Sequence, residues 1–203
     1  MITLNSDAAS TSLSKTTKAI LNEYGIKLNK NLGQNYLIDR NKRDQIIQFG
    51  NLTKDDVVLE IGPGIGTLTI ELAKRVKKVI AIEQDSNICQ ILENRLKKEN
   101  IDNVELINDD ALNVEFPKFD KIISNLPYQI SSPITFKFLN YDFQLAILMY
   151  QKEFASRMNG KVGSKDYSRL SAMLYFKCDV DWFNFVPKLP EINPGDIFEL
   201  EDG

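Results

Sequence analysis

An Asn-Leu-Pro-Tyr run is the stretch of sequence whose residue types point most directly to chemistry. Asn125 supplies an amide oxygen and Leu126 a backbone carbonyl, which Pro127 would hold outward, so two acceptors stand side by side. The amino nitrogen of a base such as adenine is a poor nucleophile because its lone pair is delocalised into the ring. Two acceptors on its N–H groups would make it pyramidal, and Tyr128 could stack on the base. The run predicts a catalytic site for an amino group, with a strand-terminating turn as the alternative.

A glycine-rich turn precedes this run in the chain. Glu60-Ile61-Gly62-Pro63-Gly64-Ile65-Gly66 follows an apolar stretch and leads into a helix expected to begin near Leu68. Glycines allow a sharp turn and a close approach of the backbone to a ligand, and the helix offers free N–H groups. The turn predicts a nucleotide-binding site at Glu60, Gly62 and Gly64. Because Pro63 interrupts the spacing of a dinucleotide fingerprint, a purely structural turn is the alternative.

Two acids follow later apolar stretches. Glu83 ends the second stretch, 17 residues beyond Gly66, where it would accept hydrogen bonds from both hydroxyls of a ribose. Asp110 follows the third stretch, on the same edge of a parallel sheet, within reach of an adenine amino group. A helix N-cap is the alternative role for either acid.

Short apolar stretches alternate with amphipathic ones, which is typical of an α/β fold with a mostly parallel sheet. Helices are expected between the strands, and Ser131 and Ser132 are the expected N-caps of a helix over 133–139. Further helices are expected over 153–158 and 169–176, and a short one near 19–24. The expected strands are 57–61, 78–83, 104–108, 121–124, 145–149 and 180–186.

The composition excludes several classes of function. The chain has 203 residues, 43% hydrophobic and 26% charged, and no histidine, so Ser-His nucleophiles and His-ligated zinc are excluded. Chemistry must rely on positioning, as an in-line displacement can. Cys89 and Cys178 lack metal-ligand spacing and are expected to be buried apolar fillers. No apolar stretch reaches the length of a membrane span, and no secretory signal is evident, so we expect a cytoplasmic protein without a metal.

Charge is distributed unevenly along the chain. The net charge is −3, yet residues 1–43 carry seven Lys or Arg against three Asp or Glu. This basic segment suits contact with phosphates, and a solvated arm is the alternative. Nothing in the sequence calls for more than a monomer.

Four motifs in order resemble the small-subunit ribosomal RNA adenine dimethyltransferases, most closely archaeal ones, over about residues 20–187. The motifs are Lys30-Asn31-Leu32-Gly33-Gln34-Asn35-Tyr36-Leu37, the turn from Glu60 to Gly66, Asp110-Ala111-Leu112, and Asn125-Leu126-Pro127-Tyr128-Gln129-Ile130-Ser131-Ser132-Pro133. The resemblance implies a Rossmann-like class I methyltransferase of the seven-stranded type. It also implies S-adenosylmethionine as cofactor and N6-dimethylation of adenosines in small-subunit rRNA within a pre-ribosomal particle.

The resemblance also implies roles for individual residues. Asn35 and Leu37 would contact the cofactor from the N-terminal side, Gly62 would lie under its methionine part, and Glu83 would hold its ribose. Asp110 would bind the adenine, and Asn125 would face both the cofactor and the target base. Gln34, Glu60 and Gly64 complete the expected cofactor set.

Departures from the family pattern define the expected domains. Tyr36 stands where the family often has Phe, and Asp109 replaces a usual Gly. The family continues past Val186-Pro187 with an aromatic and proline motif, a last strand and a small helical domain, none of which residues 190–203 match, although 197–200 could form a short strand. We therefore expect a basic extension over 1–29, a methyltransferase domain over 30–187 and an acidic tail over 188–203.

Two alternatives to the favoured function remain open. One is a resistance-type methyltransferase that modifies a large-subunit adenosine with the same fold and chemistry. The other is a ribosome-assembly or transcription factor that keeps the fold without productive catalysis. The run from Asn125 to Pro133 favours the small-subunit group.

Overall fold

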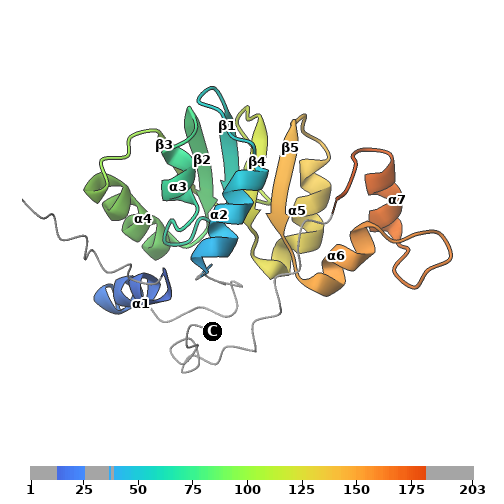
Figure 1. Ribbon diagram of the computed structural model, residues 1–203, viewed down its shortest axis with the longest axis horizontal. Helices are drawn as coiled ribbons and strands as arrows, with labels where there is room; N and C mark the ends of the chain where they lie inside the picture. Colours follow the sequence, from blue (N-terminus) through green and yellow to red (C-terminus); the bar gives the residue numbers. More distant parts are fainter. Residues whose placement is uncertain (1–12, 26–36, 38, 182–203) are drawn as a thin grey trace, which may run out of the picture.

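A five-stranded sheet forms the centre of the molecule (Figure 1). The computed structural model describes residues 13–25, 37 and 39–181. All strand pairs in this part of the chain are parallel, in the order β3-β2-β1-β4-β5. The chain builds outward from β1 in one direction, then crosses to the other side at β4, so the order reverses between β1 and β4. The strands are β1 (Val57–Ile61), β2 (Lys78–Glu83), β3 (Val104–Asn108), β4 (Lys121–Asn125) and β5 (Leu145–Met149).

The sequence predicted these five strands correctly. β4 runs one residue further than expected, so Asn125 is its last residue rather than the first residue of the turn. Of the strand expected over 180–186, Val180 and Asp181 are not in a strand, and the remaining residues lie outside the described part. The short strand considered over 197–200 lies there too.

Most helices follow the predicted pattern, with three corrections. The helix over Arg40–Phe49 was not expected from the sequence, and the helix expected near 19–24 begins earlier and spans Leu13–Glu23. The third correction concerns the start of α5. The serines expected to cap α5 do not cap it: Ser131 is its first helical residue, and the N-cap position is Ile130, which makes no side-chain capping hydrogen bond. A 3-10 turn over Tyr128–Ile130 runs directly into the helix, and the Ser131 hydroxyl donates to the Tyr128 carbonyl instead (2.9 Å). The helices are α1 (Leu13–Glu23), α2 (Arg40–Phe49), α3 (Thr69–Ala73), α4 (Ser86–Lys98), α5 (Ser131–Phe138), α6 (Lys152–Met158) and α7 (Arg169–Tyr175). Among the described helices, none has both the length and the apolarity to span a membrane.

The sheet has two buried faces because alternate residues of each strand point to opposite sides. Val58 faces α2 and α3, in a cluster with Ile47 and Leu72. Its neighbour Leu59 faces the other side, where it packs with Phe138 of α5. Both faces are covered, which explains why the strands read as continuous apolar stretches.

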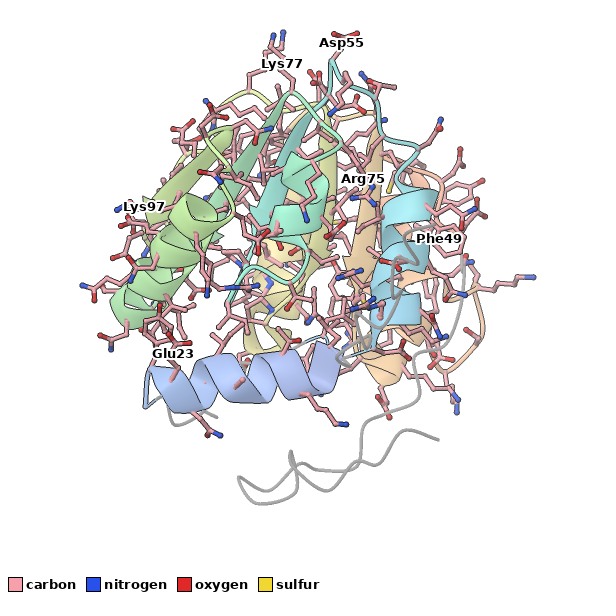
Figure 2. All side chains as sticks on the ribbon, turned by 60° about the vertical axis from the view of Figure 1, so that its left-hand side comes forward. Glu23, Phe49, Asp55, Arg75, Lys77 and Lys97 are labelled. Atoms are coloured by element: carbon pink, nitrogen blue, oxygen red, sulfur yellow. The ribbon has the colours of Figure 1, made fainter. Side chains whose placement is uncertain are left out.

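Helix α1 packs against the edge of the sheet where the strands end. Leu21 is buried in a cluster with Ile65 of the glycine turn and with Ile88 and Ile91 of α4. Figure 2 shows α1 running across the end of the molecule opposite Asp55 and Lys77, which precede β1 and β2. Part of the basic N-terminal segment is therefore packed against the body of the protein.

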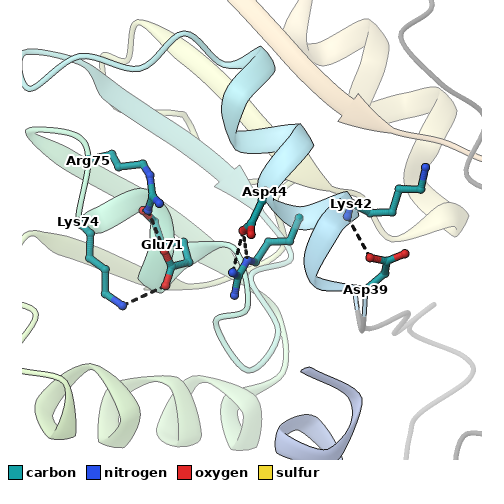
Figure 3. A network of polar contacts seen from close by, with 7 residues as sticks. Asp39, Lys42, Asp44, Glu71, Lys74 and Arg75 are labelled. Atoms are coloured by element: carbon teal, nitrogen blue, oxygen red, sulfur yellow. Dashed lines mark hydrogen bonds and ion pairs between the residues drawn. The ribbon is translucent and has the colours of Figure 1, made fainter. Parts of the chain in front are cut away.

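Surface charges are paired along α2 and α3 (Figure 3). Glu71 accepts from both Lys74 and Arg75 (3.0 and 2.8 Å), and Arg43 pairs with Asp44 (2.7 Å). Asp39 caps α2 by accepting from the Lys42 amide. Each pair has at least one well-exposed partner (Asp44, Lys74 or Arg75), and such pairs usually contribute little to stability.

A buried ion pair lies at the opposite edge, where the strands begin. Lys121 contacts Asp56 at 2.9 Å, with side chains 8% and 9% exposed, and also donates to the Asn51 carbonyl. Although burial alone would raise it, hydrogen bonds from Thr53 and Lys121 lower the pKa of the Asp56 carboxyl. The pair ties the loop before β1 to the start of β4.

Replacing Lys121 by Met should therefore be costly. Lys121→Met leaves the Asp56 carboxylate buried without its cation, and we expect a loss of about 3–5 kcal/mol in the free energy of unfolding. Lys78→Met is the matched control, because it removes the exposed pair of Lys78 with Glu105 and should cost less than about 1 kcal/mol. Urea unfolding at neutral pH measures both variants, and equal losses would contradict the assignment.

Candidate active site at the carboxyl edge of the sheet

The site forms beyond the point where the regular ladder between β1 and β4 ends. The ladder between them pairs Val58 with Lys121 and Leu59 with Ile122. Beyond this point the Ser124 side chain links the two strands. Its hydroxyl donates to the Ile61 carbonyl (2.5 Å) and accepts from the Ile61 amide (3.1 Å). Ligands of open parallel sheets bind at the carboxyl edge where the strand order reverses. The end of β1 and the end of β4 are thus held together at the place where a ligand is expected.

The glycine turn and the Asn-Leu-Pro-Tyr run meet at this place. Gly62 has φ +68°, Gly64 φ +54° and Gly66 φ +88°, all in the left-handed region that glycine tolerates. A Cβ atom on Gly62 would lie 3.0 Å from the Pro127 ring, so the proline side chain packs closely against the Gly62 backbone. Two motifs about 60 residues apart in the sequence therefore form one site.

Glu83 ends β2 beside the glycine turn. One carboxylate oxygen accepts from the Gly64 amide (3.2 Å) and the other from the Asp85 amide (3.0 Å). Burial raises the pKa of Glu83, and these backbone donors oppose the shift. Each oxygen keeps acceptor capacity for a further donor such as a ribose hydroxyl. Asp85, rather than Glu83, caps α4.

Glu60 lies beneath the turn, in the interior. It is 1% exposed, and its Oε2 atom has no hydrogen-bond partner among the described residues. Burial raises its pKa to about 8; the nearby Thr69 hydroxyl opposes this shift without reaching hydrogen-bonding geometry, and the charge of Glu83 adds to it. Glu60 is therefore protonated over much of the physiological pH range.

The Asn-Leu-Pro-Tyr run is anchored by its second residue. Leu126 is 1% exposed and packs with Ile134 in the core, while Asn125, Pro127 and Tyr128 are half-buried at the edge. The Pro127 carbonyl accepts from the Ile130 amide. Among the described residues, none donates to the Leu126 carbonyl. That oxygen keeps the acceptor capacity that the sequence assigned to it.

Asp110 begins a tight turn after β3. Its carboxylate accepts from the Leu112 amide (2.9 Å) and from the Asn113 side chain (3.3 Å), and its carbonyl accepts from the Asn113 and Val114 amides. The capping role considered for Asp110 is thus partly realised, since it caps a turn. A half-buried carboxylate with free lone pairs is still able to accept from a ligand.

Of the three N-terminal residues predicted to bind the cofactor, the structure describes only Leu37. Leu37 is buried (8% exposed) in the cluster with Ile46 and Ile47, beneath α2. Gln34 and Asn35 lie outside the described residues.

Three residues of the site escaped the sequence analysis. Ser124 joins the two strands, Arg95 of α4 donates to the Ile65 carbonyl of the glycine turn, and Lys137 of α5 donates to the loop after Asp110. Only Ser124, a polar residue within an apolar strand, gave any signal.

The cysteines play no part in this site. Cys89 is buried as expected, but Cys178 is half-exposed, so its predicted role as a buried filler is wrong. Cys178 lies beyond the end of α7, between the exposed residues Lys177 and Asp179. Within residues 13–25, 37 and 39–181, no group of three metal-binding side chains comes together.

Comparison with known proteins identifies the family. Residues 25–198 match the sequence model of the ribosomal RNA adenine dimethylase family. The chain belongs to this family. The match includes all four motifs that carried the resemblance.

Two curated relatives are similar to most of the chain. The chain is 54% identical over 171 residues to a probable ribosomal RNA small subunit methyltransferase A of Methanosphaera stadtmanae, which covers 84% of this chain and 63% of that protein. It is also 54% identical over 170 residues to the protein of the same description in Methanothermobacter thermautotrophicus, covering 84% of this chain and 61% of that protein. The chain thus spans less than two thirds of the length of either relative.

Two solved structures share the fold. A dimethyladenosine transferase from Plasmodium falciparum superposes with a TM-score of 0.62 and 43% identity, covering 66% of this chain and 49% of that one. The 23S rRNA methyltransferase ErmE superposes with a TM-score of 0.61 and 34% identity, covering 70% of this chain and 57% of that one. The Rossmann-like methyltransferase fold is therefore confirmed.

The buried Glu60 predicts an unusual dependence of stability on pH. Between its ordinary pKa of 4.5 and about 8, the folded protein holds a proton that the unfolded chain has released. Stability contributed by the neutral carboxyl is therefore complete below the lower value and lost as the pH rises, by up to about 1.4 kcal/mol per pH unit. Glu60→Gln, neutral at every pH, should be more stable than the unmodified protein near pH 8 and should show a flatter profile.

Urea unfolding at about pH 5, 6.5 and 8 measures this difference. Glu93→Gln, at an exposed position of α4, serves as the control and should follow the unmodified protein. Parallel profiles for Glu60→Gln and the unmodified protein would show that Glu60 is not buried as a neutral acid.

Proposed function

We propose that this protein transfers methyl groups from S-adenosylmethionine to N6 of adenosines in small-subunit ribosomal RNA, forming N6,N6-dimethyladenosine. The observation that carries the proposal is the contact of Gly62 with Pro127, which brings a nucleotide-binding turn against an amine-activating run. The names of the curated relatives at 54% identity support the choice of RNA. This chain spans less than two thirds of the length of those relatives, so their activity is carried over to it as part of the proposal.

The residues at the end of β4 would activate the target amine. The Asn125 amide oxygen and the Leu126 carbonyl each accept one N6–H bond, which favours a pyramidal nitrogen with a localised lone pair. The buried Leu126 side chain fixes the position of its own carbonyl, and Tyr128 offers a ring for the base to stack on. Positioning is the main source of acceleration, since no histidine is present.

The neighbouring residues fit the cofactor. S-adenosylmethionine, when bound, supplies an electrophilic methyl group on a sulfonium. Glu83, oriented by the Gly64 and Asp85 amides, would accept from the ribose hydroxyls. Asp110 would accept from the adenine amino group, and Gly62 leaves the backbone bare beneath the methionine part. From the family resemblance, Gln34, Asn35 and Leu37 would close the site from the N-terminal side, and Glu60 would support the turn from below.

The distribution of charge supports an RNA substrate. The chain is acidic as a whole, but residues 152–169 carry five Lys or Arg against two Asp or Glu, and all five cations are exposed. This segment follows β5, next to the α5 helix that starts from the Asn-Leu-Pro-Tyr run, and Arg169 lies over the Phe136 ring of α5 (5.3 Å). Exposed cations beside the site suit a phosphate backbone. We propose that the protein acts as a monomer in the cytoplasm and that its substrate is a pre-ribosomal particle.

A resistance-type methyltransferase remains the second candidate. The TM-scores of 0.62 and 0.61 do not separate the two activities. Sequence identity does favour one of them, since the small-subunit relatives reach 54% and ErmE 34%.

The decisive test is methylation by the protein itself. Unmethylated small subunits are incubated with S-adenosylmethionine and the protein, and their nucleosides are measured by mass spectrometry. We expect N6,N6-dimethyladenosine with the unmodified protein and at least about a hundredfold less with Asn125→Ala, because one of two acceptors is lost. Asn140→Ala, at an exposed asparagine after α5, is the matched control and should remain active.

Two outcomes would contradict the proposal. Product on large subunits alone would favour the resistance-type activity. No product from a sample that binds the cofactor, together with unchanged growth of cells carrying Asn125→Ala, would favour a binding factor.

The contact at Gly62 yields a separate prediction about cofactor binding. Gly62→Ala adds a Cβ at 3.0 Å from Pro127 on a left-handed backbone, so the turn must move. Gly163→Ala is the control: its φ is +85°, yet nothing lies within 4 Å of the new Cβ. Both variants carry backbone strain of about 1–2 kcal/mol, but only Gly62→Ala should weaken binding of S-adenosylhomocysteine, by at least about tenfold in calorimetry. Equal affinities would separate the turn from the ligand site.

A further inference from the structure

Lys137 on α5 makes an unusual set of contacts with the loop after Asp110. Its ammonium donates to the carbonyls of Ala111 (2.9 Å), Leu112 (3.2 Å) and Val114. It also stands over the Phe116 ring, 4.3 Å from the centroid. All three donors of the ammonium group are directed at one short turn.

This turn carries the carboxylate assigned to the cofactor adenine. Leu112 is held at both ends, because its carbonyl accepts from Lys137 and its amide donates to Asp110 Oδ1 (2.9 Å). The position of the Asp110 carboxylate therefore depends on the position of Leu112. The chain of contacts runs from Lys137 through Leu112 to Asp110.

At its other end, this series of contacts reaches the Asn-Leu-Pro-Tyr run. Helix α5 begins at Ser131, whose hydroxyl holds the Tyr128 carbonyl, and the Thr135 hydroxyl donates to the Ser131 carbonyl (2.6 Å). Its face is fixed in the core by Ile134 and Phe138. Helix α5 thus begins next to the proposed base site. About two turns later, its Lys137 donates hydrogen bonds to the loop at the proposed adenine site.

We propose that Lys137 is a positioning residue that holds the Asp110 carboxylate in place and so sets selectivity for the adenine amino group of the cofactor. The inference rests on the proposed function. It assigns Lys137 no contact with the cofactor or the RNA. A merely structural lysine would stabilise the loop without affecting which ligand the site prefers.

The test compares two ligands that differ at the adenine amino group. S-adenosylhomocysteine carries the amino donor, whereas S-inosylhomocysteine presents an oxygen there, which a carboxylate disfavours. By calorimetry, the unmodified protein should prefer the adenosyl ligand by at least about tenfold. Lys137→Met keeps the apolar stem beside Phe116 but removes the three hydrogen bonds, and the preference should fall below about threefold, as it should in Asp110→Asn.

Three further variants complete the design. Lys98→Met, at the exposed end of α4, is the matched control and should keep the full preference. Lys137→Arg retains a cation and donors and should restore part of the preference. Thermal melting verifies that each variant is folded, and Lys137→Gln replaces the Met variant if that one does not fold.

The outcomes separate this inference from the proposed function. Loss of preference with Lys137→Met supports the inference. If Lys137→Met weakens the binding of both ligands equally, or changes the binding of neither, Lys137 is only a structural residue and the inference is overturned. An unmodified protein that binds both ligands equally also overturns it, because Asp110 would then not read the amino group. An unmodified protein that binds neither ligand refutes the proposed function, and the inference fails with it.

Discussion

The junction between β1 and β4 is the constraint on which the site depends. Where the regular ladder between these strands stops, Ser124 replaces it with two hydrogen bonds to Ile61. The residues that follow, Gly62 on one side and Pro127 on the other, are then forced into contact. Neither turn can move away without exposing a fully buried hydroxyl, which is costly. The fold therefore holds the glycine turn and the Asn-Leu-Pro-Tyr run close together through one polar side chain.

The sequence predicted the parts of this arrangement that depend on burial. Each strand is covered on both faces and therefore reads as a continuous apolar stretch, and parallel strands necessarily bring Glu83, Asp110 and Asn125 to one edge. Local turns were harder to predict. Serines before an apolar stretch look like N-caps, yet Ser131 lies inside the helix because a 3-10 turn precedes it. The sequence pattern of a cap and that of a first turn are the same.

The residues that hold the site together were largely missed, for a physical reason. Lys137 and Arg95 bind backbone carbonyls 26 and 30 residues away. A carbonyl belongs to every residue, so its capture leaves no trace in the sequence of the acceptor. Lysines and arginines on helices are usually solvated, and nothing in their spacing distinguished these two. Such contacts emerge only when the fold brings the partners together.

Buried charge is treated differently at the two edges of the sheet. At the amino edge, Asp56 is paired with Lys121, and its pKa is lowered. At the carboxyl edge, burial raises the pKa of both Glu60 and Glu83, and within the described residues no cation pairs with either. Evolution towards stability alone would pair or replace such acids, because an unpaired buried carboxyl disfavours the folded state near neutral pH. Perturbed acids at the edge where ligands of parallel sheets bind are instead typical of a functional site. The asymmetry is an argument, independent of any motif, that the carboxyl edge is the working edge of this sheet.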